Sequence, residues 1–346
     1  MGLGASVVYR IHFTVEDLAR TRVAQPPPLM ELGAAVRVLQ TRSHPTRFGA
    51  WRRAAFTCLE PRARMVLDLI PPDGWAPTFL TSADIGSPQE LLERARATPR
   101  SRIRKDLAHV AERQSLPPWA YHLAEDSDLL RQVCDSLDHV YAVLLSPNWS
   151  HVTREAAVDQ GVQTRQVLTG GLDALFASLN PRRIRWSPPV LEVAMLSGFD
   201  GDLHLEGRGL LLVPSLFGVE VPAVDIDAEP QPVVRYPISH DQRSDPTPLS
   251  AWPAPDAAPP GARSPVASLL GRSRAAVLHA IAENPGCSTK ELAHLTGLAP
   301  PSASEHATTL RTAGLIRTVR HHSAALHSPT ALGVTLLSLA PGKPWL

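Results

Sequence analysis

A proline-rich stretch between residues 239 and 265 divides this 346-residue chain and limits what the chain can fold into. It reads SHDQRSDPTPLSAWPAPDAAPPGARSP and lacks any apolar periodicity. Such a segment buries too little surface to offset the entropy cost of ordering, and proline-rich linkers behave as semi-rigid spacers. We therefore expect a linker over 239–265, a large domain over 1–238 and a smaller domain over 266–340.

Composition excludes several classes of protein. Hydrophobic residues make up 44% of the chain and charged residues 19%, but no uninterrupted apolar run is long enough to span a membrane. The first residues also lack the basic stretch and apolar core of a secretory signal. The three cysteines, Cys58, Cys134 and Cys287, lie far apart, which favours a reducing compartment and small core residues over disulfides. We expect a cytoplasmic protein with no membrane association and no cofactor or metal.

The N-terminal region reads as a mixture of helices and strands. Residues 7–13 predict a strand, and Thr14 with Asp17 predicts the start of a helix. Apolar spacing predicts helices over 29–39 and 130–144, and Pro147 suits the first turn of a helix that runs towards Leu179. Short strands follow over 190–193, 203–205, 209–213 and 233–238. The fold class is therefore α+β, with strand pairing left open.

The C-terminal domain carries the clearest local signals. A helix over 274–282 stops at Asn284-Pro285-Gly286, and Ser288 with Glu291 forms a capping box that starts the next helix. Gly297 suits a tight turn, since a positive φ costs glycine least, and a third helix follows over 301–313. A hairpin over 315–327 and a last helix over 330–339 complete the order of a winged helix-turn-helix domain.

Several short motifs in this domain resemble the signature of ArsR-type winged-helix transcriptional regulators, over Gly271 to Leu339. They are Glu291-Leu292-Ala293, Gly297-Leu298, Ser304-Glu305-His306, Leu310-Arg311 and Ala313-Gly314-Leu315-Ile316. The N-terminal region resembles the uncharacterised extension of some actinobacterial members of this group. The resemblance implies a homodimer that binds an operator with two half-sites.

The sequence departs from the family pattern at two positions. Ala299 stands where a serine cap is usual, and Ala307 stands where a leucine is usual. Metal sensing is not implied, because Cys287 is isolated where the family's metal site needs a cysteine-rich stretch.

The expected partner is double-stranded DNA. Between residues 264 and 340 six basic residues exceed three acidic ones, which is a local basic patch in a chain of net charge +1. We expect helix 301–313 to read a major groove, and wing 317–323 to contact the backbone or minor groove. The candidate DNA-binding residues are Lys290, Ser302, Ser304, Glu305, His306, Thr308, Thr309, Arg311, Arg317, Arg320, His321 and His322.

Other features have less specific interpretations. The pairs Asp200/Asp202 and Asp225/Asp227 favour structural roles near strand ends, and the arginine-rich run over 94–105 favours a solvated helix face. No nucleotide-binding or catalytic motif is present in the sequence. We expect a transcriptional regulator without enzymatic activity, whose N-terminal domain dimerises, senses an unknown small-molecule effector, or both. The alternative is an enzyme or protein-interaction protein that uses the winged helix as a targeting module.

Overall fold

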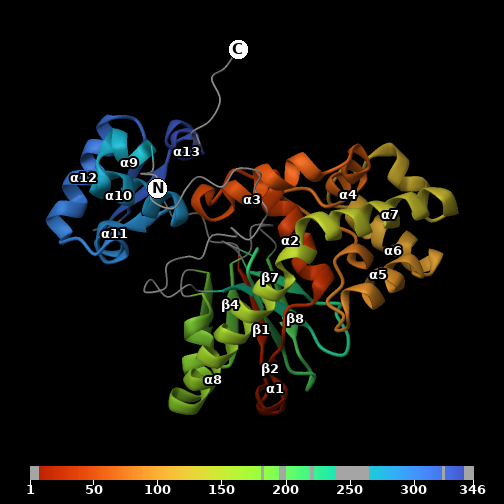
Figure 1. Cartoon of the computed structure of the whole chain (residues 1–346). Coiled ribbons are helices and arrows are strands. Elements are labelled where there is room, and N and C mark those ends of the chain that lie inside the picture. The colour runs from red at the N-terminus through yellow and green to blue at the C-terminus, as the bar shows by residue number, and fades with distance from the viewer. Residues whose placement is uncertain are drawn as a thin grey trace. The chain divides into compact units, whose positions relative to one another are not determined.

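The computed structural model describes residues 8–180, 183–194, 200–218, 222–238, 265–321 and 324–338 (Figure 1). The chain packs as two compact units, one formed by residues 1–40 and 58–239 and the other by residues 41–57 and 240–346. Helices and strands mix in the first unit, so the predicted α+β class is confirmed. No helix in the described ranges is long and apolar enough to cross a membrane. The predicted linker lies outside the described residues, apart from Pro265.

Two four-stranded sheets form the centre of the first unit. The first sheet has the order β3-β4-β1-β5, in which β1 pairs antiparallel with β4 and parallel with β5. Its strands are β1 (Tyr9–His12), β3 (Ile184–Ser187), β4 (Val190–Val193) and β5 (Gly201–His204). The second sheet has the order β2-β6-β8-β7, with β2, β6 and β8 parallel. Its strands are β2 (Arg22–Val23), β6 (Leu211–Ser215), β7 (Ala223–Asp225) and β8 (Val233–Pro237).

One apolar core joins both sheets to α8 (Trp149–Leu179), which is interrupted at Gly171, where the backbone is not helical (φ 67°, ψ −163°). Ile11 of the first sheet, Leu212 of the second and Phe176 of α8 are all fully buried in it. Alternation along each strand explains the arrangement, because every second side chain points to the same face of a sheet. The predicted helix towards Leu179 is therefore present but broken at Gly171, and the part after the break supplies Leu175, Phe176 and Leu179 to the core.

Three of the remaining helices of the first unit, α1 (Val15–Arg20), α5 (Pro88–Arg96) and α7 (Ser127–Leu144), start at a residue whose side chain caps the helix. Thr14 caps α1 and exchanges hydrogen bonds with Asp17, as predicted. The other helices are α2 (Pro28–Gln40), α4 (Arg64–Leu69) and α6 (Arg100–Ala111). Helix α2 is tied to the second sheet by buried Glu31, which accepts hydrogen bonds from the Ser215 hydroxyl and the Leu216 and Phe217 amides. Burial raises the pKa of Glu31 despite these bonds.

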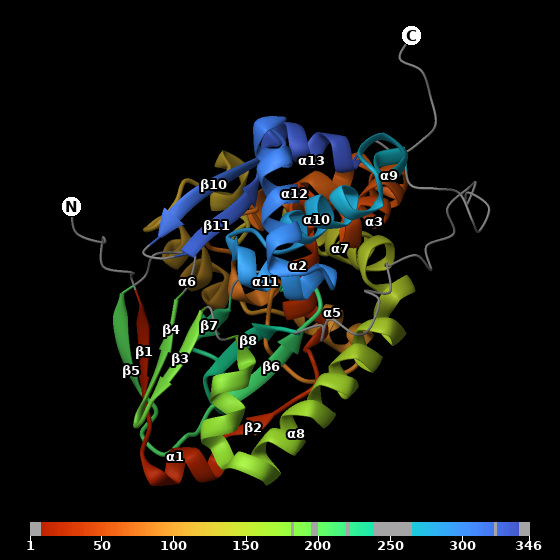
Figure 2. The ribbon, with the colours of Figure 1, turned by 90° about the vertical axis from the view of Figure 1, so that its left-hand side faces the viewer.

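The second unit contains the predicted winged helix (Figure 2). Its helices are α9 (Pro265–Leu270), α10 (Arg272–Glu283), α11 (Thr289–Thr296), α12 (Pro300–Thr312) and α13 (Ala331–Ser338). The strands β9 (Cys287–Ser288), β10 (Ile316–His321) and β11 (Ala324–Pro329) form an antiparallel sheet in the order β10-β11-β9. Val277, Leu278, Ile281, Leu292 and Leu310 are buried in its core. Cys287 is also buried there and Cys134 is buried in α7, whereas Cys58 is exposed, so the expectation of core cysteines fails at Cys58.

Helix α3 (Pro45–Cys58) groups with the second unit through residues 41–57. The sequence analysis assigned these residues to the domain over 1–238, because they precede the linker. In the structure His44 Nδ1 lies 3.0 Å from Glu283 Oε2 at the end of α10. A contact between residues so distant in sequence leaves no local pattern to read. The other predicted domain boundaries stay a prediction.

The close packing around Gly333 of α13 predicts that a larger residue at this position lowers the stability of the winged helix. A Cβ atom at this position would lie 2.1 Å from the Leu315 carbonyl oxygen. Gly333→Ala should therefore destabilise the second unit by about 1–3 kcal/mol, the usual cost of overpacking. Thermal denaturation followed by circular dichroism measures the effect. Thr335→Ala, at an exposed position of the same helix, serves as the control, and equal melting of both variants would contradict the prediction.

Candidate nucleic-acid interface

The helix-turn-helix begins at a reciprocal cap. Ser288 Oγ accepts a hydrogen bond from the Glu291 amide at 3.3 Å, and Glu291 Oε2 accepts one from the Ser288 amide at 2.8 Å. Helix α11 then ends at Gly297, whose φ of 65° is left-handed. The Leu298 amide donates back to the Ala293 carbonyl oxygen at 3.0 Å, a bond typical of glycine-ended helices. This short turn fixes the direction in which α12 starts.

Helix α12 divides into a buried face and an exposed face. Ala303, Ala307 and Leu310 lie in the core of the second unit, at helical spacing. The opposite side presents Ser304, Glu305, Thr308, Thr309 and Arg311, all exposed, while Ser302 and His306 are half-buried. Ala299 precedes the helix and provides no side-chain cap, as the sequence indicated. The structure thus brings the predicted recognition residues onto one side of one helix.

The wing places its two arginines on opposite faces. In the β10–β11 ladder Arg317 pairs with Ser328, and Arg320 pairs with Ala325. Residues three apart in a strand point to opposite sides, so Arg317 lies on one face of the ribbon and Arg320 on the other. Both are exposed. Figure 2 shows the ribbon beside α12, and the two elements are in contact.

Lys290 and the predicted histidines His321 and His322 do not belong to α12. Lys290 is exposed in the first turn of α11. His321 is the last residue of β10, and His322 lies outside the described residues. The basic side chains that the structure shows exposed on these elements are Lys290, Arg311, Arg317 and Arg320. They outnumber the two exposed acids, Glu291 and Glu305.

The sequence analysis missed a buried histidine that holds the wing. His327 of β11 is 4% exposed. Its Nε2 lies 2.9 Å from the Thr289 hydroxyl at the start of α11, and its Nδ1 lies 3.0 Å from the Thr318 hydroxyl of β10. One imidazole therefore links the wing to the helix-turn-helix. Burial, and then the charge of Arg311, lower the pKa of His327. Strand alternation in the hairpin is the only sequence signal that could have placed it inward.

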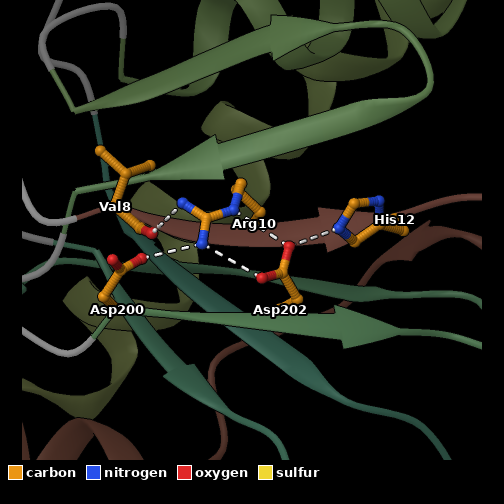
Figure 3. Close-up of polar contacts among 5 residues, drawn as sticks. All are labelled: Val8, Arg10, His12, Asp200 and Asp202. Carbon is orange, nitrogen blue, oxygen red and sulfur yellow. Dashed lines mark hydrogen bonds and ion pairs between the residues drawn. The ribbon is translucent and has the colours of Figure 1, made fainter.

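A second polar cluster lies on β1 and β5 of the first unit (Figure 3). Arg10 Nε donates to Asp202 Oδ1 at 3.0 Å, and Arg10 Nη2 donates to Asp200 Oδ1 at 2.9 Å. His12 Nε2 lies 2.7 Å from Asp202 Oδ1. The hydrogen bonds from Arg10, and then the contact with His12, hold the pKa of Asp202 far below its usual range. The two acids are thus engaged in a surface ion-pair network, which fits the structural role that the sequence indicated.

This network does not make a metal site. Within the described ranges no group of three histidine, cysteine, aspartate or glutamate side chains is arranged to hold a metal ion. The winged helix remains the region with the clearest functional geometry.

Comparison with known proteins supports this assignment of the winged helix. Residues 270–323 match the model of the MarR family. The match runs from the end of α9 past β10, so it covers both helices of the helix-turn-helix and the first strand of the wing. The predicted helix-turn-helix regulator region is confirmed, whereas the ArsR type and the resemblance of the N-terminal region stay predictions. No curated protein matches the chain. No solved structure matches it either.

The buried His327 makes the stability of the wing depend on pH. Because the folded pKa lies below that of an unfolded histidine, the unfolded chain binds more protons on acidification. We expect protection of residues 316–321 and 324–329 from hydrogen exchange to fall as the pH drops below about 6.5. His327→Gln keeps neutral hydrogen-bonding groups and should flatten this dependence.

His294→Gln, at an exposed position of α11, is the matched control and should leave the pH dependence unchanged. His279, whose pKa burial also lowers, retains part of the effect in both variants. A slope in His327→Gln as steep as in the parent chain would contradict the role of this histidine.

Proposed function

We propose that this chain is a DNA-binding transcriptional regulator that reads a major groove with α12. The observation that carries the proposal is the division of α12 into a face fixed in the core and a polar face left exposed. A recognition helix needs this division, because its outer side chains must reach base edges. The MarR-family match over residues 270–323 supports the same function.

The exposed side chains of α12 suit direct contact with base pairs. Ser302, Ser304 and His306 lie in its first half, at the end of a recognition helix that usually enters the groove. Glu305 can accept a hydrogen bond from the amino group of cytosine. Thr308 and Thr309 are placed for flanking phosphates, although the Thr309 hydroxyl donates to the Glu305 carbonyl oxygen at 3.1 Å.

The basic groups around α12 suit contact with the phosphate backbone. Arg317 and Arg320 approach from the two faces of the wing, and His321 and His322 follow as further candidates in the sequence. Lys290 at the start of α11 and Arg311 near the end of α12 complete the set. Phosphate contacts fix the position of a protein on the duplex, whereas base contacts select the sequence.

We further propose a homodimer that binds two half-sites. One recognition helix reads only a few base pairs, and a symmetric second copy supplies the rest of the specificity. The first unit then provides dimer contacts, senses a small-molecule effector, or does both. Size-exclusion chromatography with light scattering tests this, and a monomer with and without operator DNA would exclude it.

Selection of genomic DNA fragments by the purified full chain tests the proposed function most directly. We expect enrichment of fragments that share a motif with two related half-sites. Fluorescence anisotropy on the best fragment then gives affinity and its salt dependence. If no fragment is enriched and anisotropy shows no binding, the winged helix is a protein-interaction module and the proposal fails.

Replacing the wing arginines should weaken binding to every DNA sequence alike. We expect Arg317→Ala and Arg320→Ala each to lower affinity and to reduce the slope of log K against log salt by about 1, because each loses a phosphate contact. Arg272→Ala removes an exposed arginine from the start of α10 and should change neither quantity. Unchanged salt slopes in both wing variants would remove the wing from the interface.

Replacing Glu305 should change sequence preference instead. Glu305→Ala loses the acceptor for cytosine, so discrimination at one base pair of each half-site should fall by about 1–3 kcal/mol. Loss of a negative charge should also strengthen binding to unrelated DNA. Anisotropy competition with single-base operator variants measures both effects, with Thr312→Ala near the end of the same helix as control. A uniform loss at all positions would contradict a direct base contact.

A further inference from the structure

A tight turn in the first unit holds two arginines beside each other. Asp17 of α1 is fully buried, and its Oδ1 accepts a hydrogen bond from the Gly209 amide at 3.1 Å. Burial pushes the pKa of Asp17 up, but hydrogen bonds from Thr14, Gly209 and Gly207 outweigh it, so the pKa lies below its usual value. Gly209 has a φ of 71°, and a Cβ atom there would lie 2.7 Å from the backbone carbon of Arg20. Only glycine permits this close approach of the turn to α1.

The turn and α1 together fix the two guanidinium groups through backbone carbonyls. Arg20 Nη1 donates to the Gly207 carbonyl oxygen at 2.8 Å, and Arg208 Nε donates to the Leu205 carbonyl oxygen at 3.2 Å. Arg20 also pairs with exposed Glu16 at 2.7 Å. Arg22, two residues after Arg20, forms no ion pair or side-chain hydrogen bond with any part of the chain that the structure describes.

These three arginines line an open hollow of about 420 Å³, together with Pro230 and Gln231. We call it the arginine hollow. Its size falls within the range of about 300–1,000 Å³ that is usual for small-molecule sites. None of its five lining residues is acidic, so the arrangement concentrates positive charge at one place in a chain whose net charge is only +1.

Gln231 gives a second, independent observation at the arginine hollow. This side chain is only 6% exposed, and its Nε2 atom is buried without a hydrogen-bond partner among the described residues. An unpaired buried donor is costly, and it is rare in folded proteins. Gln231 lines the hollow, and the terminal torsion of glutamine is broad, so its amide is free to adapt to an acceptor bound there.

A smaller hollow of about 140 Å³ adjoins the arginine hollow and shares Arg22, Pro230 and Gln231 with it. Its other charged lining residues are Arg94, Asp84 and Glu229, whose charges largely compensate. Glu16 compensates the charge of Arg20 in the larger hollow, but the charges of Arg22 and Arg208 remain there without an acidic lining residue. A ligand that compensates this positive charge must carry negative charge and hydrogen-bond acceptors.

We propose that the arginine hollow binds a small polyanion, a molecule with two or more phosphate or carboxylate groups. Guanidinium groups present paired donors that match both kinds of oxyanion. Three arginines around one hollow suit more than one anionic group, and the concave shape suits a small molecule. The site lies entirely within the first unit, so this proposal does not depend on whether the winged helix binds DNA.

Isothermal titration calorimetry on the full chain, without DNA and in a chloride buffer, tests the proposal. The probes are inorganic pyrophosphate and citrate, with acetate as a singly charged control. We expect at least one polyanion to bind in a 1:1 ratio, and acetate to bind far more weakly. Binding of pyrophosphate alone would assign phosphate groups, binding of citrate alone would assign carboxylates, and binding of both would support a general polyanion site. No heat of binding from either polyanion at millimolar concentrations would overturn the proposal.

Three variants locate the binding. Arg22→Ala should weaken it about tenfold or more, because charge-assisted hydrogen bonds are lost. Gln231→Glu preserves shape but places a carboxylate among the arginines, so it should abolish binding. Arg165→Ala removes an exposed arginine of α8, away from the hollow, and should bind as the parent does. Equal losses in Arg22→Ala and Arg165→Ala would show non-specific attraction and overturn the proposal. Since Arg22 is exposed, its variant remains informative even if Gln231→Glu fails to fold.

Discussion

The packing of Ala303, Ala307 and Leu310 into the second unit determines the rest of the proposed interface. Once these residues are buried, the intervening side chains of α12 must face outward, because a helix turns through about 100° per residue. Two of these three buried residues are alanines, whose small side chains let α12 approach its neighbours closely. The same core holds Leu315 and Ile316 at the start of β10, so the direction of the wing follows from the packing that orients α12.

Elements set by neighbouring residues were predictable from the sequence. Each of these elements depends on residues only a few positions apart, so the residue types alone indicate it. Examples are the caps at Thr14 and Ser288 and the left-handed Gly297. Strand pairing was not predictable, since β1 lies between strands nearly two hundred residues away in the chain. The grouping of α3 with the second unit has the same cause, because His44 and Glu283 meet only after the chain has folded.

The candidate interface was predictable in composition but not in detail. Helical periodicity separated the core residues of α12 from the polar ones, and the structure agrees with that division. The opposite orientations of Arg317 and Arg320 depend on the register of β10 and β11, which the amino-acid sequence alone does not define. His327 ends the predicted hairpin over 315–327, and the sequence does not indicate that its two hydroxyl partners come from α11 and β10. Burial of a polar residue becomes evident only when its partners are known.

Because residues 41–57 belong to the second unit, the chain connects the two units more than once. The polypeptide enters the second unit for one helix, returns to the first, and enters again after the proline-rich stretch. A fragment that began at that stretch would lack α3 and the contact between His44 and Glu283. The winged helix therefore shares its unit with a segment that the chain joins to the first unit at both ends, so the proline-rich stretch is one of three covalent connections between the units.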